Sequence, residues 1–117
     1  MHKEEILRKN EDFSNVYKKG KSLGEQYIVF FYRKNYKQIN RVGFLASKKV
    51  GNSVLRNRAR RLMKESYRNL KNNIITGYDM IFIARNKIVG CKQIDVEKSM
   101  KRALKRSELS IKKYEKN

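Results

Sequence analysis

Apolar residues recur along this chain with the two periods that distinguish helices from strands. Residues 10–19 fit a helix in which Phe13 and Tyr17, four positions apart, share one face. Asn10 is expected to cap this helix and Gly20 to end it. Three runs of strand length follow, over residues 27–33, 41–47 and 78–84.

A second helix is expected over residues 53–70 and a third from Asp95 onward. The predicted order is α-β-β-α-β-α, with a short extra strand possible over residues 21–24. Helices packed on a mixed, mostly antiparallel sheet suit this order, so the expected fold class is α+β, a two-layer α/β sandwich. A chain of 117 residues is expected to form a single domain over residues 1–117. Its ends, residues 1–6 and 110–117, are expected to be mobile.

The helix over residues 53–70 carries the strongest pattern in the chain. At about 100° per residue, one arc of it is mostly apolar: Leu55, Ala59, Leu62, Met63, Ser66 and Leu70. Another arc is basic and polar: Arg56, Asn57, Arg60, Arg61, Lys64 and Arg68. Such a helix can bury one face and hold a dense positive stripe in water. Like charges four residues apart repel each other, so a stripe of this kind indicates a polyanionic partner.

The whole chain is basic, with 30 Lys and Arg against 11 Asp and Glu and a formal net charge of +19. This excess is the electrostatic footprint of a nucleic-acid binder, and an anionic membrane surface is the competing polyanion. No apolar run approaches the ~18 residues that span a bilayer, and the first residues lack the apolar core of a signal peptide. We therefore expect a cytoplasmic protein with no membrane partner.

One cysteine, Cys91, and one histidine, His2, leave few routes to catalysis by the protein itself. They allow no intrachain disulfide, no thiolate metal cluster and no conventional nucleophile–histidine arrangement. The helix dipole accounts for Glu11 and Asp12, and no carboxylate pair suggests metal-assisted phosphodiester cleavage. We expect no catalytic residue and no metal site on the protein, and an incidental role for Cys91.

The loop before the basic helix, residues 48–53, combines Lys48 and Lys49 with Gly51 and Asn52. Backbone N–H groups at a helix N-terminus attract anions, and glycine lets a phosphate approach closely. The spacing is not that of a nucleotide-binding P-loop. Arginine on the helix suits bidentate phosphate contacts, and Asn57 is able to pair with a base edge or a 2′-hydroxyl. The alternative is that the stripe is merely the solvated surface of a cationic protein.

Aromatic residues suggest a second surface. Val29 and Phe31 share one face of the strand at 27–33 with Tyr27, while Ile28, Phe30 and Tyr32 share the other. A sheet covered by helices on one side leaves its other face as a groove, where aromatic side chains stack unpaired bases. The alternative interpretation is that these residues are core.

Two segments carry a resemblance to a known family. The first is residues 41–43, Arg-Val-Gly, and the second is residues 47–62, Ser-Lys-Lys-Val-Gly-Asn-Ser-Val-Leu-Arg-Asn-Arg-Ala-Arg-Arg-Leu, with a specific Arg-Asn-Arg centre. Residues 9–13, 17–20 and 81–85 add to it. Together they closely resemble the protein subunit of bacterial ribonuclease P, over about residues 7–104.

The resemblance implies an α/β sandwich with an unusual left-handed crossover through the basic helix, against the usual right-handed rule. It implies a partnership with a large catalytic RNA that removes the 5′ leader from precursor tRNA, using Mg²⁺ held mainly by RNA. The residues implied to contact that RNA are Lys48, Lys49, Asn52, Arg56, Asn57, Arg58, Arg60, Arg61, Lys64 and Arg68. Those implied to line a groove for the single-stranded leader are Phe13, Tyr17, Val29 and Phe31.

The chain departs from the family pattern at residues 44–46, Phe-Leu-Ala, where a smaller polar residue is common, so the groove near Leu45 is expected to contact the leader differently. Asn86 replaces a common proline, and Ala59-Arg60 varies a common Ile/Val-Lys pair. Two functions of different class stay open on composition alone: a subunit of a ribonucleoprotein endonuclease, and a purely structural RNA-binding protein such as a small ribosomal protein. The Arg-Asn-Arg segment favours the first.

Overall fold

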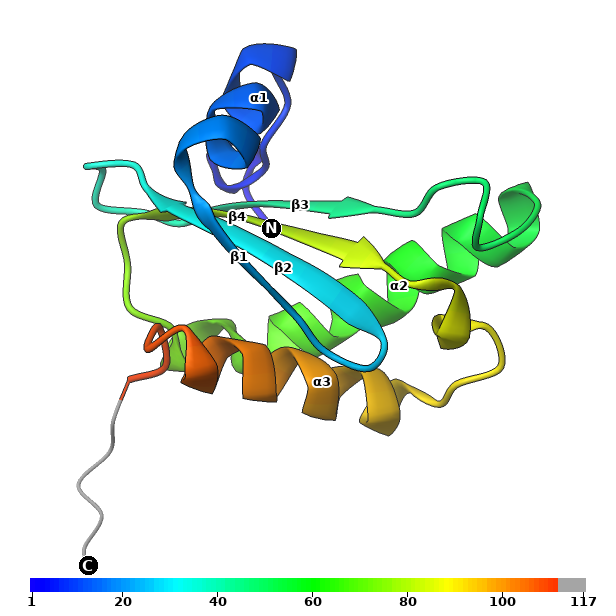
Figure 1. The fold of residues 1–117 in the computed structure, drawn as a ribbon. Coiled ribbons are helices and arrows are strands. Elements are labelled where there is room, and N and C mark those ends of the chain that lie inside the picture. The colour runs from blue at the N-terminus through cyan, green and yellow to red at the C-terminus, as the bar shows by residue number, and fades with distance from the viewer. Residues whose placement is uncertain (112–117) are drawn as a thin grey trace, which may run out of the picture.

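The computed structural model describes residues 1–111, which form three α-helices and one four-stranded sheet (Figure 1). In chain order the elements are α1 (Asn10–Lys19), β1 (Lys21–Gly24), β2 (Ile28–Lys34), β3 (Arg41–Leu45), α2 (Ser53–Leu70), β4 (Tyr78–Ala84) and α3 (Gln93–Arg106). Short 3-10 turns lie at Lys3–Glu5, Lys71–Asn73 and Asn86–Ile88. The strand order is β1-β2-β4-β3, with antiparallel β1–β2 and β2–β4 pairs and a parallel β3–β4 pair.

This arrangement confirms the predicted α+β class, the mixed sheet and the extra strand β1. The chain leaves β3, forms α2 and returns in β4 beside and parallel to β3. The left hand of this crossover stays an expectation from the family resemblance. Of the termini expected to be mobile, residues 1–6 form a 3-10 turn and a bridge from Ile6 to Val42, and Ser110 bridges to Ile74. Residues 112–117 lie outside the described part of the chain.

Four details of the expected element ends were wrong. The strand expected at residues 27–33 is β2, which spans Ile28–Lys34. Asn10 is the first residue of α1 rather than its cap, which is Lys9. The strand expected at residues 41–47 ends at Leu45, and α3 begins two residues before Asp95, whose carboxylate accepts from the Lys92 backbone N–H at 3.3 Å.

Gly20 does end α1, but in extended backbone rather than in the left-handed conformation of a typical helix stop. A Cβ on Gly20 would lie 2.5 Å from the carbonyl oxygens of Tyr32 and Val16. Glycine is therefore needed here because the chain passes close to β2, and this close approach sets where α1 meets the sheet.

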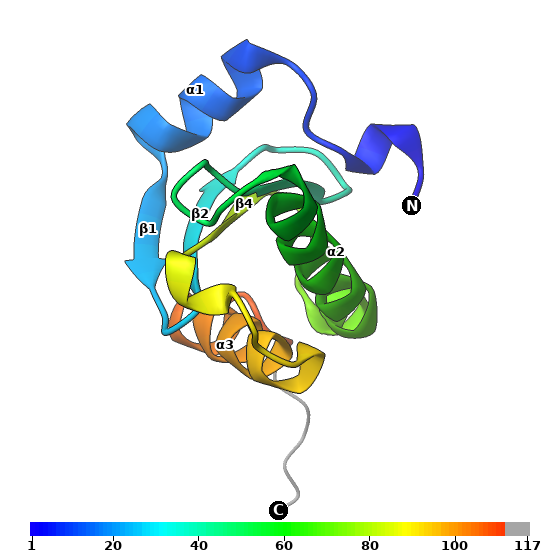
Figure 2. The same cartoon turned by 90° about the vertical axis from the view of Figure 1, so that its right-hand side faces the viewer.

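Helices α2 and α3 cover one face of the sheet, and α1 crosses the other face (Figures 1 and 2). The larger core cluster lies between the sheet and the α2/α3 layer, where Phe30, Phe82 and Met63 are fully buried. The Phe30 ring stacks on Phe82 at a centroid distance of 4.7 Å. Tyr67 of α2 is also buried there, and burial raises its pKa to about 12. The α2 face therefore extends beyond the apolar arc assigned from the sequence.

The α1 face of the sheet is built as three rows across neighbouring strands. One row is charged and contains Arg33, Asp79 and Arg41. The next is apolar and contains Phe31, Ile81 and Gly43, and the third contains Val29, Ile83 and Leu45. A smaller core cluster joins the second row to α1 through Leu7, Phe13 and Val16, and the third row stays partly exposed.

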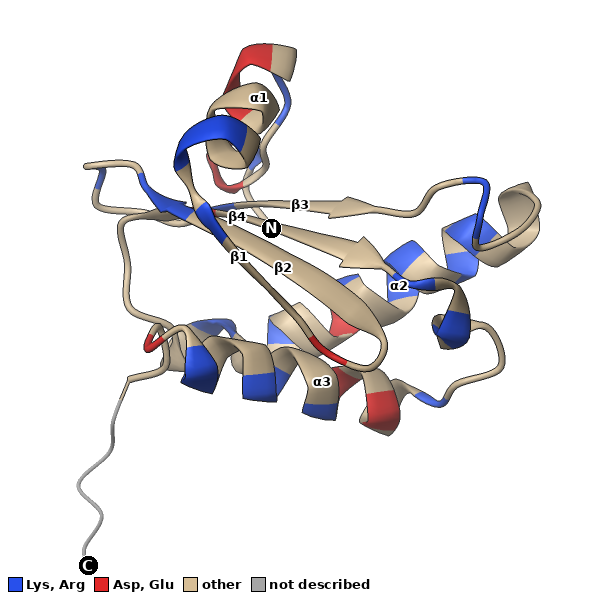
Figure 3. Ribbon diagram, in the orientation of Figure 1, with Lys and Arg blue, Asp and Glu red and all other residues tan. Residues whose placement is uncertain are grey.

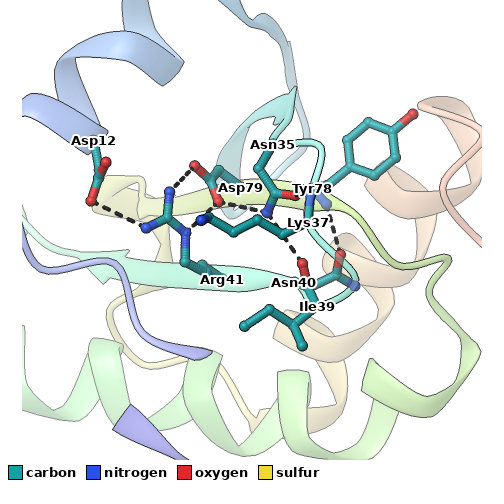
Figure 4. A network of polar contacts seen from close by, with 8 residues as sticks. All are labelled: Asp12, Asn35, Lys37, Ile39, Asn40, Arg41, Tyr78 and Asp79. Atoms are coloured by element: carbon teal, nitrogen blue, oxygen red, sulfur yellow. Dashed lines mark hydrogen bonds and ion pairs between the residues drawn. The ribbon is translucent and has the colours of Figure 1, made fainter. Parts of the chain in front are cut away.

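An ion-pair network at the charged row holds α1, β3 and β4 together (Figure 4). Arg41 donates from Nε and Nη2 to the two carboxylate oxygens of Asp79, at 2.8 and 2.7 Å, and from Nη1 to Asp12 of α1 at 3.3 Å. Asp79 is buried and also accepts from Asn35 Nδ2 at 2.9 Å. The hydrogen bonds to Asp79 raise the pKa of Arg41, even though burial acts in the opposite direction. Bidentate geometry of this kind fixes orientation as well as charge.

A second ion-pair group joins the β1–β2 turn to α3. Glu25, whose side chain is only 9% exposed, pairs with Arg102 at 3.1 Å and with Arg106 at 2.6 Å. Burial would raise the pKa of Glu25, but the hydrogen bonds from Arg106 and Arg102 outweigh it and lower that pKa. One acid therefore pairs with two arginines on the outer surface of α3 and offsets one of their two positive charges.

Replacing Arg41 by alanine should lower the free energy of unfolding by about 3 kcal/mol, because the buried Asp79 carboxylate loses its bidentate partner. Denaturant unfolding of the isolated protein measures this. Arg68→Ala is the matched control, since Arg68 pairs with Glu65 on an exposed surface and should change stability by less than about 1 kcal/mol. Equal losses in the two variants would contradict a structural role for the Arg41 network.

Candidate nucleic-acid interface

Helix α2 forms where the sequence supplies a cap and an amphipathic run. Asn52 caps it, because its Oδ1 accepts the Leu55 backbone N–H at 3.0 Å. The buried face is Ala59, Met63, Ser66, Tyr67 and Leu70. Most of the cations lie on the rest of the helix surface and give α2 its blue stripe in Figure 3. No acidic residue stands in its first turn, so the positive end of the helix dipole adds to the side-chain charge.

The cations of α2 differ in what already holds them. Arg56 donates to the Gly51 carbonyl at 3.0 Å, Arg60 donates to Asn57, and Arg68 pairs with Glu65 at 2.7 Å. Arg61 and Lys64 form no ion pair with any residue that the structure describes. The contacts of Arg56, Arg60 and Arg68 each use only part of the guanidinium group, which leaves further N–H donors for phosphate oxygens.

Arg58 points elsewhere. Its Nη2 donates to the Cys91 carbonyl at 2.7 Å, which ties the first turns of α2 to the segment just before α3. At about 100° per residue, Arg58 lies on a different side of α2 from Arg56 and Arg60. The contact with Cys91 shows that this side of the helix packs against the segment before α3. Cys91 therefore matters here through its backbone carbonyl, while its thiol donates to the Lys87 carbonyl at 3.2 Å.

The loop before α2 exposes both Lys48 and Lys49. It closes on itself, because the N–H groups of Lys49, Val50 and Gly51 donate to Ser47 and Lys48. These three amides are therefore already occupied. An anion at this corner would meet the two lysine side chains and the first amides of α2.

The four residues expected to form a groove lie on the α1 face. The Tyr17 ring, 40% exposed, meets the Phe31 ring edge-on at a centroid distance of 5.0 Å. Phe13 packs against Gly43, where an added Cβ would lie only 2.8 Å from its ring. Val29 belongs to the outer apolar row with Ile83 and Leu45. Phe13 and Phe31 thus both pack with the smaller core cluster and remain partly exposed, which combines the two alternatives drawn from the sequence.

A cleft of about 400 Å³ joins this face to α2. It opens beside β3, the edge strand of the sheet, and its lining includes Phe13, Gly43, Leu45, Arg60, Arg61 and Lys64. Phe13 is therefore the groove residue that the fold brings next to the basic stripe. Tyr17, Val29 and Phe31 do not line this cleft. An apolar floor beside a cationic wall suits a nucleic-acid strand, whose bases are flat and whose phosphates are charged.

Sequence reasoning missed Ile83, and it placed Leu45 near the groove only through the family resemblance. Both stand in one row with Val29, since Val29 faces Ile83 across β2–β4 and Leu45 faces Ile83 across β3–β4. Residues 81 and 83 alternate with residues 80 and 82, so the two pairs face opposite sides of the sheet. This alternation indicates the face on which Ile83 lies, but only the strand order shows which residues lie beside it.

Within residues 1–111, no group of three or more His, Cys, Asp or Glu side chains is arranged to hold a metal ion. Over the same residues, no helix is both long enough and apolar enough to cross a membrane. The groups that this surface offers to a ligand are the cations of α2, the backbone amides at its N-terminus and the apolar side chains of the groove.

Comparison with known proteins gives one consistent family. The family model described as Ribonuclease P matches residues 1–108. The chain is 46% identical over 106 residues to the ribonuclease P protein component of Clostridioides difficile (strain 630), covering 90% of this chain and 93% of that protein. It is 47% identical over 106 residues to that of Clostridium botulinum (strain Langeland), covering 90% and 96%.

Solved structures agree with the sequence matches. The RNase P protein of Staphylococcus aureus, in a mutant described as defective in mRNA degradation activity, superimposes with a TM-score of 0.84 at 32% identity, covering 92% of this chain and 91% of that one. The RNase P protein of Thermotoga maritima gives a TM-score of 0.79 at 33% identity, covering 87% and 96%.

Gly43→Ala should lower the free energy of unfolding by about 1–3 kcal/mol, because the new methyl group overlaps the Phe13 ring and must displace it. Gly24→Ala is the matched control in β1, where an added Cβ would make an ordinary contact of 3.7 Å with Arg85. Denaturant unfolding of both variants tests the point. A Gly43→Ala protein as stable as Gly24→Ala would mean that α1 does not depend on this close approach.

Proposed function

We propose a division of RNA contacts between two surfaces of this chain, which belongs to the family of bacterial ribonuclease P protein components. It is a protein subunit of ribonuclease P, an endoribonuclease that processes tRNA, and its partner is RNA. In the proposal, α2 and its preceding loop bind the catalytic RNA, and the α1 face binds the 5′ leader of precursor tRNA. A cytoplasmic location follows for a bacterial enzyme with this substrate.

The basic stripe supports the first half of the proposal. The residues assigned to the catalytic RNA are Lys48, Lys49, Asn52, Arg56, Asn57, Arg58, Arg60, Arg61, Lys64 and Arg68. A folded RNA presents closely spaced phosphates, and arginine forks match them in a bidentate way. Asn52 and Arg58 act from the flanks in this scheme: Asn52 fixes the start of α2, and Arg58 anchors it near Cys91.

The groove supports the second half. Phe13, Tyr17, Val29 and Phe31 are assigned to the leader, together with Leu45 and Ile83 as parts of the floor. A single-stranded leader exposes base faces, and stacking on aromatic rings tolerates any base. Mature tRNA lacks the leader, so this surface would favour the substrate over the product.

Bond cleavage is assigned to the RNA with Mg²⁺ held mainly by RNA. Mg²⁺ is usually bound through one or two carboxylates together with phosphate oxygens. The described residues offer no carboxylate cluster on the α2 stripe or in the groove, and their surplus cations would repel the ion. These protein residues do not fit a metal site, so their role is to bind and orient RNA.

The protein free of RNA should not cleave precursor tRNA, and adding a bacterial-type catalytic RNA with Mg²⁺ should give cleavage at the 5′ end of the mature tRNA. The observation behind this is the cleft in which cations of α2 adjoin the apolar surface of the α1 face. Site-specific cleavage by rigorously RNA-free protein would refute it. Tight binding to the RNA without any gain in cleavage would favour a structural RNA-binding role.

Arg60→Ala should weaken binding to the catalytic RNA by about tenfold, the usual order for a charge-assisted phosphate contact. Arg58→Ala should weaken it less but lower the unfolding free energy more, since Arg58 holds the Cys91 carbonyl. Filter binding and denaturant unfolding separate the two effects. Equal losses of RNA affinity would show that both arginines face the RNA in the same way.

Phe31→Ala should reduce affinity for precursor tRNA by about ten- to hundredfold and leave affinity for mature tRNA nearly unchanged, because stacking is worth roughly 1–3 kcal/mol per base. Phe31→Leu is the matched variant: it keeps apolar volume under α1 but removes the ring. Titration of the holoenzyme with each tRNA gives the ratio of its affinity for precursor tRNA to its affinity for mature tRNA. If both variants melt much lower and bind the two tRNAs equally badly, Phe31 serves only as core.

A further inference from the structure

A second cleft, which the proposed function does not use, lies at the C-terminal end of α1. It occupies about 480 Å³ where α1 ends, β1 begins and β2 and α3 end (Figure 1). We call it the tyrosine cleft, and its lining residues include Tyr32, Tyr36, Tyr78, Lys19, Lys21, Arg33 and Lys34. Its volume falls within the ~300–1,000 Å³ typical of small-molecule sites, which is enough for a nucleotide.

The charges of the tyrosine cleft are not balanced. Lys19, Lys21, Arg33 and Lys34 form no ion pair with any residue between 1 and 111. Glu108 is the single acid among its lining residues. Figure 3 shows basic segments meeting at the end of α1, the start of β1 and the end of β2. The two arginines at the outer face of α3 are different, because Glu25 pairs with both of them. Four clustered cations beside a single acid favour an anionic ligand.

An exposed aromatic ring stands beside these cations. Tyr36 is 88% exposed and has a backbone φ of 59°, in the left-handed region that residues other than glycine seldom adopt. The turn is held by Asn35, whose Oδ1 accepts the Lys37 N–H at 2.8 Å and whose Nδ2 donates to Asp79 at 2.9 Å. The network that fixes α1 therefore also fixes the backbone of the turn that presents this ring to solvent. A tyrosine ring open to solvent is able to stack on a base.

The tyrosine cleft begins where the leader groove ends. Tyr17 of α1 belongs to the groove, while Lys19 at the end of α1 and Lys21 at the start of β1 line the cleft. Along β2, Phe31 belongs to the groove and Arg33, on the same face, lines the cleft, while Lys34 lines it from the opposite face at the end of the strand. A few residues of chain span at most about 10–15 Å, so a single RNA strand is able to reach both sites.

We propose that the tyrosine cleft binds the distal part of the 5′ leader, upstream of the nucleotides held in the leader groove. Its lysines and Arg33 contact the phosphates, and the exposed Tyr36 ring stacks on a base. The inference rests on the proposed function of the groove. A single strand fits the combination of cations and an open aromatic face better than a duplex, whose bases are already stacked.

The test uses the reconstituted holoenzyme and three RNAs: mature tRNA, a precursor with a leader of about five nucleotides, and one with about fifteen, spanning the range of known single-strand sites. Lys21→Gln/Lys34→Gln removes two cations from the cleft. Tyr36→Asn removes the ring and keeps a residue that tolerates the left-handed turn. Lys98→Gln/Lys101→Gln on the exposed side of α3 is the control with the same change of charge.

Wild-type holoenzyme should bind the long-leader precursor roughly tenfold more tightly than the short-leader one, on the scale of one or two stacked and phosphate-bound nucleotides. The double lysine variant should lose most of that gain, and Tyr36→Asn about fivefold of it, or ~1 kcal/mol. Both variants should bind the short-leader precursor as the wild type does, and the α3 control should keep the full gain.

Absence of any gain on lengthening the leader would overturn the inference while leaving the groove function intact. Equal losses for all three RNAs would also overturn it, because the cleft would then contact the catalytic RNA or the tRNA body. If the α3 control loses as much of the affinity gain as the cleft variant does, the gain depends on the net charge of the protein alone, and a specific site is refuted. If the wild type fails to distinguish the short-leader precursor from mature tRNA, the groove function and this inference both fall.

Discussion

The bidentate pair between Arg41 and Asp79 is the interaction on which the rest of this structure depends. Its partners are 38 residues apart in the chain, yet they face each other at the start of the parallel β3 and β4 strands. The pair therefore fixes the register in which the chain returns after α2. Through Asp12 it also fixes α1, and through Asn35 it fixes the turn that carries Tyr36. One buried carboxylate thus positions three parts of the RNA-facing surface.

Fixing α1 over only part of the sheet has a functional consequence. The helix covers the row of Phe31 and Ile81 and leaves the row of Val29, Ile83 and Leu45 partly exposed. On the other face, α2 packs through its apolar side, and its Arg60, Arg61 and Lys64 line the cleft beside β3 together with Phe13 and Leu45. In the proposed function, this arrangement would let the protein hold two RNAs in a defined relation.

The local pattern of apolar and polar residues was enough to predict most helices and strands, but not how the strands pair or which elements contact one another. The ends of α2 and β4 follow from helical periodicity and from a compact apolar run, so both were placed correctly. The dipole explained Asp12 locally, but its contact with Arg41 depends on strand pairing that no local pattern encodes. Gly20 was assigned to a helix stop, whereas its real constraint is the nearby β2 backbone. Ile83 was missed, and Leu45 was placed near the groove only through the family resemblance, because the two residues become neighbours only in the parallel β3–β4 register.

The central claim is that the α1 face meets the leader and α2 meets the catalytic RNA. Tethering a hydroxyl-radical source to single cysteines measures this directly, with Val29→Cys for the groove and Lys64→Cys for the helix, both in a Cys91→Ser background. The account predicts that the Val29 tether cuts the leader of bound precursor tRNA and spares most of the catalytic RNA. It predicts that the Lys64 tether cuts the catalytic RNA whether or not precursor tRNA is bound. Cleavage of the leader from position 64 alone, or of the same catalytic-RNA nucleotides from both positions, would contradict it.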